Sequence, residues 1–325
     1  MSLQSPAAPP AAGAPLGATS APTAPTAIVA PLAAELAGVL AATAARRTLR
    51  VRVEARPGWG AWRRWRGGRW SSRRSVTLGR LAGEDVALMA TGDGPAAAAA
   101  GLQALLAAVS PRRLLAIGVA GGLTPGLAEG TLVAARQVIA GDGAMVPREP
   151  DAAWLAAALA GGAIAGTVVS ADRILADPAT RQAVLGKALP AAAMPATTAM
   201  PARTVTAAMP DAIAVVDLES VAYARVAAAR SLPYLVVRAV LDPANERLPL
   251  DFEACRDGSG RVSNARVLAH ALARPRSLGK LWRLRTRVRD AAAGLAILAE
   301  RLVAAPAAAD TCREIPAAAA GRRTA

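Results

Sequence analysis

The sequence predicts an α/β fold in which a doubly wound, mixed sheet lies between helices, and three observations carry that prediction. Residues Ala212–Leu218 and Tyr234–Leu241 are apolar runs typical of buried strands. Between them, Ser220–Arg230 has the cap and spacing of a helix. Two earlier apolar runs, Val86–Thr91 and Leu114–Val119, also predict strands, and each is followed by glycines. Such an alternation of strands and helices is typical of α/β domains.

Acidic residues follow both strands of this strand–helix–strand segment. Asp217 and Glu219 lie at the end of the first strand, and Asp242 lies at the end of the second. We expect the unit to be parallel and right-handed, and the ligand crevice of an open α/β sheet lies beyond the carboxyl ends of its strands. The sequence therefore predicts that the three carboxylates meet at a site for carboxylate chemistry.

Composition limits that chemistry further. The 325 residues carry a net charge of +15 with 36 arginines and 2 lysines, so part of the charge could reflect a coding bias toward Arg. Basic residues concentrate in two patches, 46–80 and 274–289, which could orient the protein on an anionic surface. Cys255, Cys312 and His270 are the only residues of their types. Zinc sites, disulfide frameworks and His-activated nucleophiles are thus poorly supported, which leaves carboxylates, hydroxyls and Arg.

We expect one folded domain with appendages. The α/β domain spans residues 27–263, and a basic helical extension spans 264–303. Residues 1–26 contain six prolines and no charge, and we predict that this leader and the tail 304–325 are disordered. No basic segment precedes Arg46, which disfavours a secretory signal and favours a cytoplasmic location.

The first element of the domain is predicted to be a strand, Ala27–Pro31, that turns into a helix with Glu35 near its start. The segment 27–45 is nearly uncharged, yet it is mostly Ala, and a mid-span acid would cost about 2.5 to 3.5 kcal/mol in a membrane. By position alone, Glu35 suits a first-turn residue that the helix dipole favours.

Residues Arg56–Arg74 hold four of the six tryptophans among arginines and glycines, which predicts a surface loop. Trp and Arg favour the membrane interface and anionic headgroups. Bases of single-stranded nucleic acid stacked on the indoles are the rival interpretation, and a solvated insertion without function is a third. A second insertion, residues 190–210, is rich in Pro and Met and could be a mobile lid or a segment without function.

The segment Gly92-Asp93-Gly94-Pro95 opens an Ala-rich helix after a strand, as in a dinucleotide fingerprint. A dinucleotide-binding fold requires an acidic residue at the end of the next strand, but this strand ends in Ala120-Gly121-Gly122. A dehydrogenase is therefore disfavoured. The glycines can still bring the backbone close to a ribose, phosphate or flat base, and tight helix packing is the alternative.

A long amphipathic helix is predicted from Leu281, because apolar residues recur at steps of three and four. They are Leu281, Leu284, Val288, Ala291, Leu295, Leu298 and Leu302. With Trp282 and four arginines beside it, this stripe could lie in a membrane interface. Packing on the domain or on a second subunit is the alternative.

Several segments resemble one enzyme superfamily. VDLESVAYARVAA and VVRAVLDPAN are similar to the MEAAA and RxxSD signatures of purine nucleoside phosphorylases and adenosyl nucleosidases, and IGVAGGLTPGLAEGTLV and MATGDGPAAAAAG resemble their glycine segments. ERLP and ARPRSLGKLWRL resemble one branch, the hopanoid-associated phosphorylases or adenosylhopane nucleosidases. The resemblance covers about residues 27 to 303 and implies a sheet of the nucleoside phosphorylase type.

The resemblance implies cleavage of the N-glycosidic bond of a lipid-linked adenine nucleoside, with Asp242 as general acid and Glu35 handling the attacking water. It places Glu219 and Leu218 at the ribose. The residues expected near the base or phosphate are Gly92, Gly94, Ala120, Gly121, Gly122, Ser170 and Asp172. The chain departs from the family at Ala116, where phosphorylases carry a phosphate-binding Arg, and at Leu241, which replaces the Ser of the SD pair.

We expect no cofactor or metal, with water favoured as acceptor and inorganic phosphate remaining open as co-substrate. A soluble substrate of the methylthioadenosine or adenosylhomocysteine type is the alternative, and a noncatalytic membrane-binding or nucleic-acid-binding protein is the alternative from another class. We also expect a homo-oligomer with peripheral contact to the inner face of the membrane through residues 56–74 and 276–303. Nucleic acid is disfavoured as a partner.

Overall fold

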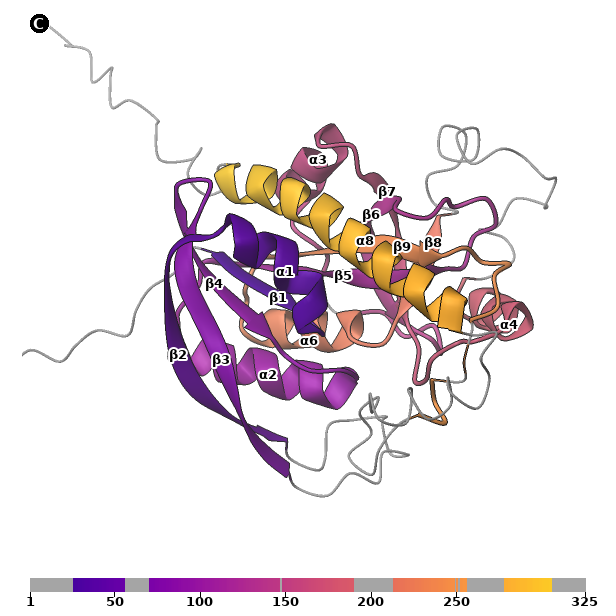
Figure 1. The fold of residues 1–325 in the computed structure, drawn as a ribbon, viewed down its shortest axis with the longest axis horizontal. Coiled ribbons are helices and arrows are strands. Elements are labelled where there is room, and N and C mark those ends of the chain that lie inside the picture. Colours follow the sequence, from indigo (N-terminus) through magenta and orange to yellow (C-terminus); the bar gives the residue numbers. More distant parts are fainter. Residues whose placement is uncertain are drawn as a thin grey trace, which may run out of the picture.

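The computed structural model describes residues 26–55, 70–146, 148–189, 213–248, 250, 252–255 and 278–305. Within them a nine-stranded mixed sheet lies between helices on both faces (Figure 1). The predicted α/β fold class, with its doubly wound mixed sheet and C-terminal helix, is confirmed. The predictions for the leader, the 190–210 insertion and nearly all of the tail fall outside the described residues.

The observed elements follow the predicted order closely. The strands are β1 Thr26–Ala30, β2 Ala44–Ala55, β3 Trp70–Leu81, β4 Glu84–Ala90, β5 Arg113–Gly122, β6 Leu132–Ala140, β7 Ile164–Ser170, β8 Ala214–Asp217 and β9 Tyr234–Asp242. The helices are α1 Ala33–Ala42, α2 Pro95–Ala108, α3 Ala152–Ala160, α4 Pro178–Ala188, α6 Ser220–Ala229 and α8 Leu278–Ala304.

The strand order is β2-β3-β4-β1-β5-β8-β7-β6-β9, and an additional β5–β9 pairing closes the last five strands into a ring. The prediction that the β8–α6–β9 unit is parallel is wrong. Strand β9 runs parallel to β5, whereas β8 pairs antiparallel with the end of β5. Because a ring lets two strands approach β5 from opposite sides, β8 and β9 need not share a direction, and the rule for parallel crossovers does not apply to them.

Glycines in β5 allow the sheet to close. The strand predicted at Leu114–Val119 runs on to Gly122, so the glycines that were expected to follow it belong to β5. A Cβ at Gly121 would lie 3.4 Å from Val216 of β8 and 3.3 Å from the Asp242 carboxylate of β9. The missing side chains thus let two strand ends approach β5 closely.

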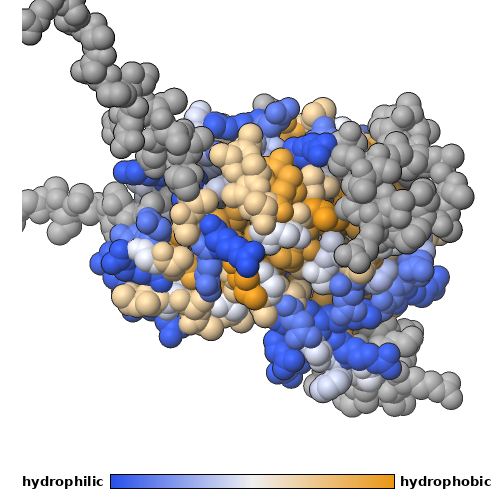
Figure 2. Space-filling view, turned by 90° about the horizontal axis from the view of Figure 1, so that it is seen from above, coloured by the Kyte–Doolittle hydropathy of each residue, from blue (hydrophilic) through white to orange (hydrophobic). Residues whose placement is uncertain are grey.

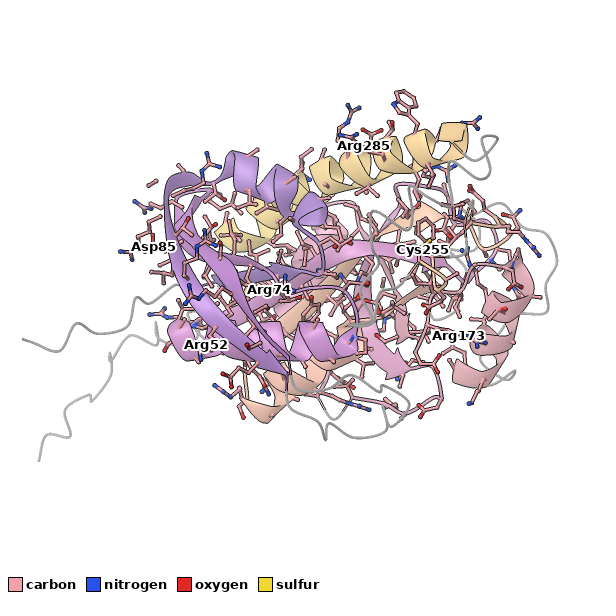
Figure 3. The ribbon with its side chains drawn as sticks, turned by 60° about the horizontal axis from the view of Figure 1, so that its bottom comes forward. Arg52, Arg74, Asp85, Arg173, Cys255 and Arg285 are labelled. Carbon is pink, nitrogen blue, oxygen red and sulfur yellow. The ribbon has the colours of Figure 1, made fainter. Side chains whose placement is uncertain are left out.

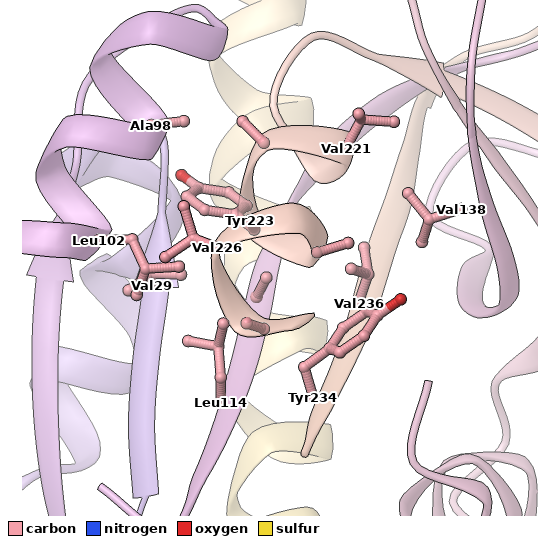
Figure 4. Close-up of a cluster of buried hydrophobic side chains, with 14 of the residues drawn as sticks. Val29, Ala98, Leu102, Leu114, Val138, Val221, Tyr223, Val226, Tyr234 and Val236 are labelled. Atoms are coloured by element: carbon pink, nitrogen blue, oxygen red, sulfur yellow. The ribbon is translucent and has the colours of Figure 1, made fainter. Parts of the chain in front are cut away.

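Two layers of apolar side chains pack the helices on the sheet. On one face, α2 and α6 pack together, with Tyr223 and Val226 of α6 near Leu102 of α2 (Figure 4). On the other face, α1, α3 and α8 share a second cluster that includes Leu36 and Leu298. Helix α4 covers a smaller third cluster beside β7 and β8.

The basic loop predicted at Arg56–Arg74 is partly wrong. Residues 70–74 belong to β3, which pairs antiparallel with β2 from Ala55↔Trp70 onward, and residues 56–69 lie outside the described structure. Arg52 is an exposed residue of the edge strand β2, whereas Arg74 of β3 is half-buried and lies further inside (Figure 3).

The amphipathic stripe of α8 packs on the domain. Its residues from Ala291 to Leu302 are buried, and its end is held by Trp154, whose Nε1 donates to Leu302 O at 2.9 Å, and by Arg113, which donates to Val303 O at 3.0 Å. None of the described helices combines the length and apolar character that crossing a bilayer requires.

A membrane role for the whole of α8 is therefore not supported, since four of the seven residues of its stripe are buried in the core. Trp282, near the start of the helix, is 70% exposed, and Arg285 stands on the outer face (Figure 3). The face on which α3 lies has an apolar area near its centre, which a hydrophilic group interrupts, and more hydrophilic residues lie around it (Figure 2).

Candidate active site

Strand β9 carries a fully buried arginine into the centre of the sheet. Arg238 is 0% exposed, and its Nη2 and Nε lie 2.7 Å and 2.8 Å from Asp217 Oδ2. The hydroxyl of Ser220 accepts from Nη2 at 2.8 Å, and Ser170 donates to Asp217 Oδ1 at 2.6 Å. Asp217 and its neighbours therefore fix the guanidinium in one orientation.

One guanidinium nitrogen of Arg238, Nη1, takes no part in these hydrogen bonds. Within the described part of the chain, Arg238 Nη1 is buried without a hydrogen-bond partner. A Cβ at Gly118 would collide with Nη1 and would lie 3.1 Å from Glu35 Oε1. The missing side chain of Gly118 thus leaves a place where a donor from Arg238 and an acceptor from Glu35 face each other.

Glu35 is held at this place by two backbone amides. Its Oε1 accepts from Val119 N at 2.9 Å, and its Oε2 accepts from Leu32 N at 2.8 Å. Burial raises the pKa of the Glu35 carboxyl, while the Val119 amide and the Arg238 charge act in the opposite direction. A raised pKa suits a carboxylate that exchanges a proton with a small molecule.

Glu219 lies against the start of α2. Its Oε1 accepts from Gly94 N at 2.7 Å, where Gly94 has φ +85° and precedes the helix. Burial first, and then the charges of Asp217 and Asp93, raise the pKa of Glu219 well above its usual range. Glu219 can therefore hold a hydroxyl either as a neutral donor or as a carboxylate acceptor.

Asp242 ends β9 and is 4% exposed. It forms an ion pair with Arg181 of α4, which is itself 1% exposed. Burial raises the pKa of Asp242, although the Arg181 charge and hydrogen bond act against burial. About 13 Å of strand separates Arg238 from Asp242, so the site has two polar ends.

The other predicted residues lie at different depths. Ser170 is buried, but it bonds Asp217 and the amide of Val221, so its hydroxyl is engaged within the protein. Leu218 is partly buried against the cluster under α4, and Asp172 is exposed. Gly92 has φ +111°, and a Cβ there would collide with Arg74. The remaining predicted residues, Ala120, Gly121 and Gly122, line the end of β5.

The sequence interpretation missed Arg238 and Arg181. A charge inside the apolar run LVVRAVL was a signal for Arg238, because a buried charge requires a partner. Among the described residues, no group of three or more His, Cys, Asp or Glu side chains could hold a metal ion.

A family model described as the phosphorylase superfamily matches residues 65–273, which is more than half of the chain. The chain belongs to the phosphorylase superfamily. The predicted superfamily is thereby confirmed, and so is the prediction that the chain is an enzyme of the nucleosidase and nucleoside phosphorylase type. No match was found among curated proteins.

Solved structures agree with phosphorylase-superfamily membership at the level of fold. A 5′-methylthioadenosine/S-adenosylhomocysteine nucleosidase from S. pneumoniae is 18% identical with TM-score 0.54, and the match covers 85% of this chain and 99% of that chain. The Neisseria meningitidis nucleosidase is 19% identical with TM-score 0.54, covering 85% and 98%. The Colwellia psychrerythraea nucleosidase, solved with adenine, is 17% identical with TM-score 0.53, covering 87% and 95%.

Proposed function

We propose that the protein hydrolyses the N-glycosidic bond of an adenine nucleoside and releases adenine. Superfamily membership supports this proposal, as does the likeness of the fold to nucleosidases that were solved with adenine or a transition-state inhibitor. The observation that carries it is the arrangement of three buried carboxyl groups that follow or end strands paired with β5: Glu35 in the first turn of α1 after β1, Glu219 just after β8, and Asp242 at the end of β9.

The two polar ends suit the two halves of the reaction. As the bond from C1′ to the base breaks, its electron pair leaves with the base, and Asp242 protonates a base nitrogen. Water attacks C1′, and its proton passes to Glu35 while Arg238 Nη1 orients the oxygen. Glu219 holds ribose hydroxyls and stabilises the positive charge that develops on the sugar.

Water is favoured over phosphate as the acceptor. Ala116 stands where the resemblance places the phosphate-binding Arg of phosphorylases, and it is fully buried in β5. At the acceptor end Asp217 already holds Arg238, the cation in contact with it, and the other two nearby side chains, Glu35 and Glu219, are acids, so acidic side chains outnumber basic ones around a phosphate dianion.

The substrate proposal extends to a nucleoside attached to a lipid, such as adenosylhopane, which the protein would reach at the inner face of the membrane, acting from the cytoplasm as a homo-oligomer. Trp282, Arg283 and Arg285 form an exposed group at the start of α8. From the same helix, Arg287 reaches Glu246, four residues after Asp242, at 2.9 Å. The exposed group at the start of α8 therefore lies near the end of the site that contains Asp242, where the base is proposed to bind.

The membrane part is tested by sedimentation with anionic and neutral vesicles. Deleting α8 would remove part of the core, so substitutions are required. Trp282→Ala with Arg283→Glu and Arg285→Glu should release the protein from anionic vesicles, since each well-placed charge contributes about 1 kcal/mol. Ile297→Ala, an exposed position on the same helix, is the matched control and should bind as the wild type does. Equal binding by all three proteins contradicts this part.

The reaction is tested by adenine release from methylthioadenosine, adenosylhomocysteine and adenosylhopane, each with and without phosphate. The proposal predicts release that does not require phosphate, with the lipid-linked nucleoside preferred. Release only with phosphate would make the enzyme a phosphorylase. Binding without release from any of the three would favour a noncatalytic protein.

A further inference from the structure

Helix α4 carries Arg181, whose guanidinium contacts the proposed acid, Asp242, and two backbone carbonyl groups. Arg181 Nε donates to Leu175 O at 3.0 Å, and Nη1 donates to Pro243 O at 2.8 Å. Nη2 forms the ion pair with Asp242. Each nitrogen of this guanidinium therefore has a protein partner, and two of the partners belong to Asp242 and to the residue that follows it.

The surroundings hold this arginine in place. The loop before α4 and the segment after β9 are also joined by Leu248 N, which donates to Ala176 O at 3.0 Å, and by Ile174 N, which donates to Glu253 Oε1 at 2.7 Å. Helix α4 itself starts at a cap, where Asp177 accepts from the backbone at 3.0 Å. These hydrogen bonds hold α4, and with it the Arg181 guanidinium, in a fixed position beside Asp242.

We propose that Arg181 is the positioning residue of the general acid: it aims the Asp242 carboxyl at the base and supplies the cation that lets this buried group release its proton. The inference rests on the proposed function, because it requires Asp242 to be the proton donor. A buried carboxyl without a cation holds its proton too tightly to be an efficient acid near neutral pH.

Other charges face Asp242 from two further elements. Burial raises the pKa of Asp242, Arg181 lowers it most among the charges, Glu246 in the following loop raises it, and Arg287 of α8 lowers it. Arg287 lies 2.7 Å from Glu129 and 2.9 Å from Glu246, so the charges of these two acids largely compensate its own. Arg181 is the cation in direct contact with the carboxyl.

The experiment measures kcat/KM against pH for adenine release in Arg181→Met and Arg181→Lys, using the nucleoside that the wild type cleaves fastest. Removing the cation should move the alkaline limb of the Met variant to higher pH and should lower kcat about 10²-fold near neutral pH, because the acid is also misplaced. The Lys variant keeps the charge but cannot hold both carbonyls. Its alkaline limb should stay near that of the wild type while its kcat falls.

Lys187→Met is the control, since it removes an exposed charge from the same helix and should leave both quantities unchanged. An alkaline limb that is the same in Arg181→Met and the wild type overturns the inference, as does a Lys variant that shifts as far as the Met variant.

A ¹³C NMR titration of the Asp242 carboxyl, assigned with Asp242→Asn, separates this inference from the proposed function. Adenine release by the wild type alone decides the function. A titration that moves to higher pH in Arg181→Met supports the charge role of Arg181, and an unchanged titration contradicts it whatever the reaction proves to be.

Discussion

Two buried arginines stand at the two ends of the site, and they are used in opposite ways. Arg238 is fixed by Asp217 and Ser220 and keeps Nη1 unpartnered within the described residues, directed at the Gly118 gap. Arg181 has a protein partner for every nitrogen, and its ion-pair partner, Asp242, is the proposed working group. At one end the carboxylate holds the arginine, and at the other the arginine holds the carboxylate.

This difference suggests how one fold separates two proton transfers. Burial disfavours the charge on Arg238, yet Asp217 and Glu219 outweigh it and raise the pKa of the guanidinium, so this end offers a permanent donor. At the other end, burial raises the pKa of Asp242 despite Arg181, so this end offers a proton that can leave. The proposed acid and the proposed water-binding donor thus stand four residues apart on one strand, with about 13 Å between their Cα atoms.

The largest effect is expected for Asp242→Asn, which keeps the shape of the acid but has no proton to transfer. Adenine release should fall by about 10³ to 10⁴-fold with little change in substrate binding. Single-turnover rates and equilibrium binding of the same nucleoside measure the two quantities. Near-normal turnover in this variant would remove Asp242 from the reaction and leave Arg181 as a structural ion pair only.

The next comparison concerns stability. Arg238→Met leaves Asp217 as a buried charge without its cation, and we expect a loss of about 3 to 5 kcal/mol in the free energy of unfolding at pH 7. Arg181→Met should cost less, because the pKa of Asp242 is already raised and this carboxyl can take up a proton instead. Urea unfolding of the two variants measures the difference. Equal losses would show that both carboxylates are held in the same way.

A smaller effect is expected for Glu219→Gln. Gln keeps the shape of Glu219 but cannot carry a negative charge, so turnover should fall only about 10-fold through lost stabilisation of the developing sugar cation. With a 2′-deoxyribosyl substrate, the variant and the wild type should differ less. The same loss with both substrates would mean that Glu219 does not hold that hydroxyl.

The smallest effect is a pH dependence of stability. A carboxyl whose folded-state pKa lies above its unfolded value binds more protons in the folded state, so stability falls as pH rises from near the ordinary value of 4.5 toward the raised pKa. Glu219→Gln removes this contribution. The free energy of unfolding of this variant, measured in urea between about pH 5 and 8, should therefore increase relative to that of the wild type as pH rises. A gain that grows toward low pH would contradict the direction assigned to Glu219.

Local sequence predicted the elements well and their pairing less well. The helix expected at Ser220–Arg230 is observed at Ser220–Ala229, and the strand expected at Tyr234–Leu241 is observed at Tyr234–Asp242. The direction of β8 was wrong because its partners, β5 and β7, lie far earlier in the chain. An apolar run identifies a strand, whereas its direction depends on contacts that the run does not contain.

The site was predicted in the same uneven way. Acids at strand ends were visible, and Arg238 could have been found from its charge inside an apolar strand. Arg181 gave no such signal, because α4 is polar by sequence and its burial depends on two loops that close over it. The stripe of α8 is equally consistent with a membrane or a core, and the contacts of Trp154 and Arg113 with its end place it in the core.

The most direct test of the account is the fate of the water oxygen. Adenine release by the purified enzyme in H₂¹⁸O, with phosphate present, should place ¹⁸O on C1′ of the released sugar at a rate that does not depend on phosphate. Arg238→Lys should slow this step while retaining the same product. Formation of ribosyl 1-phosphate without ¹⁸O at C1′ would contradict the assignment of Glu35 and Arg238 as the groups that hold the attacking water.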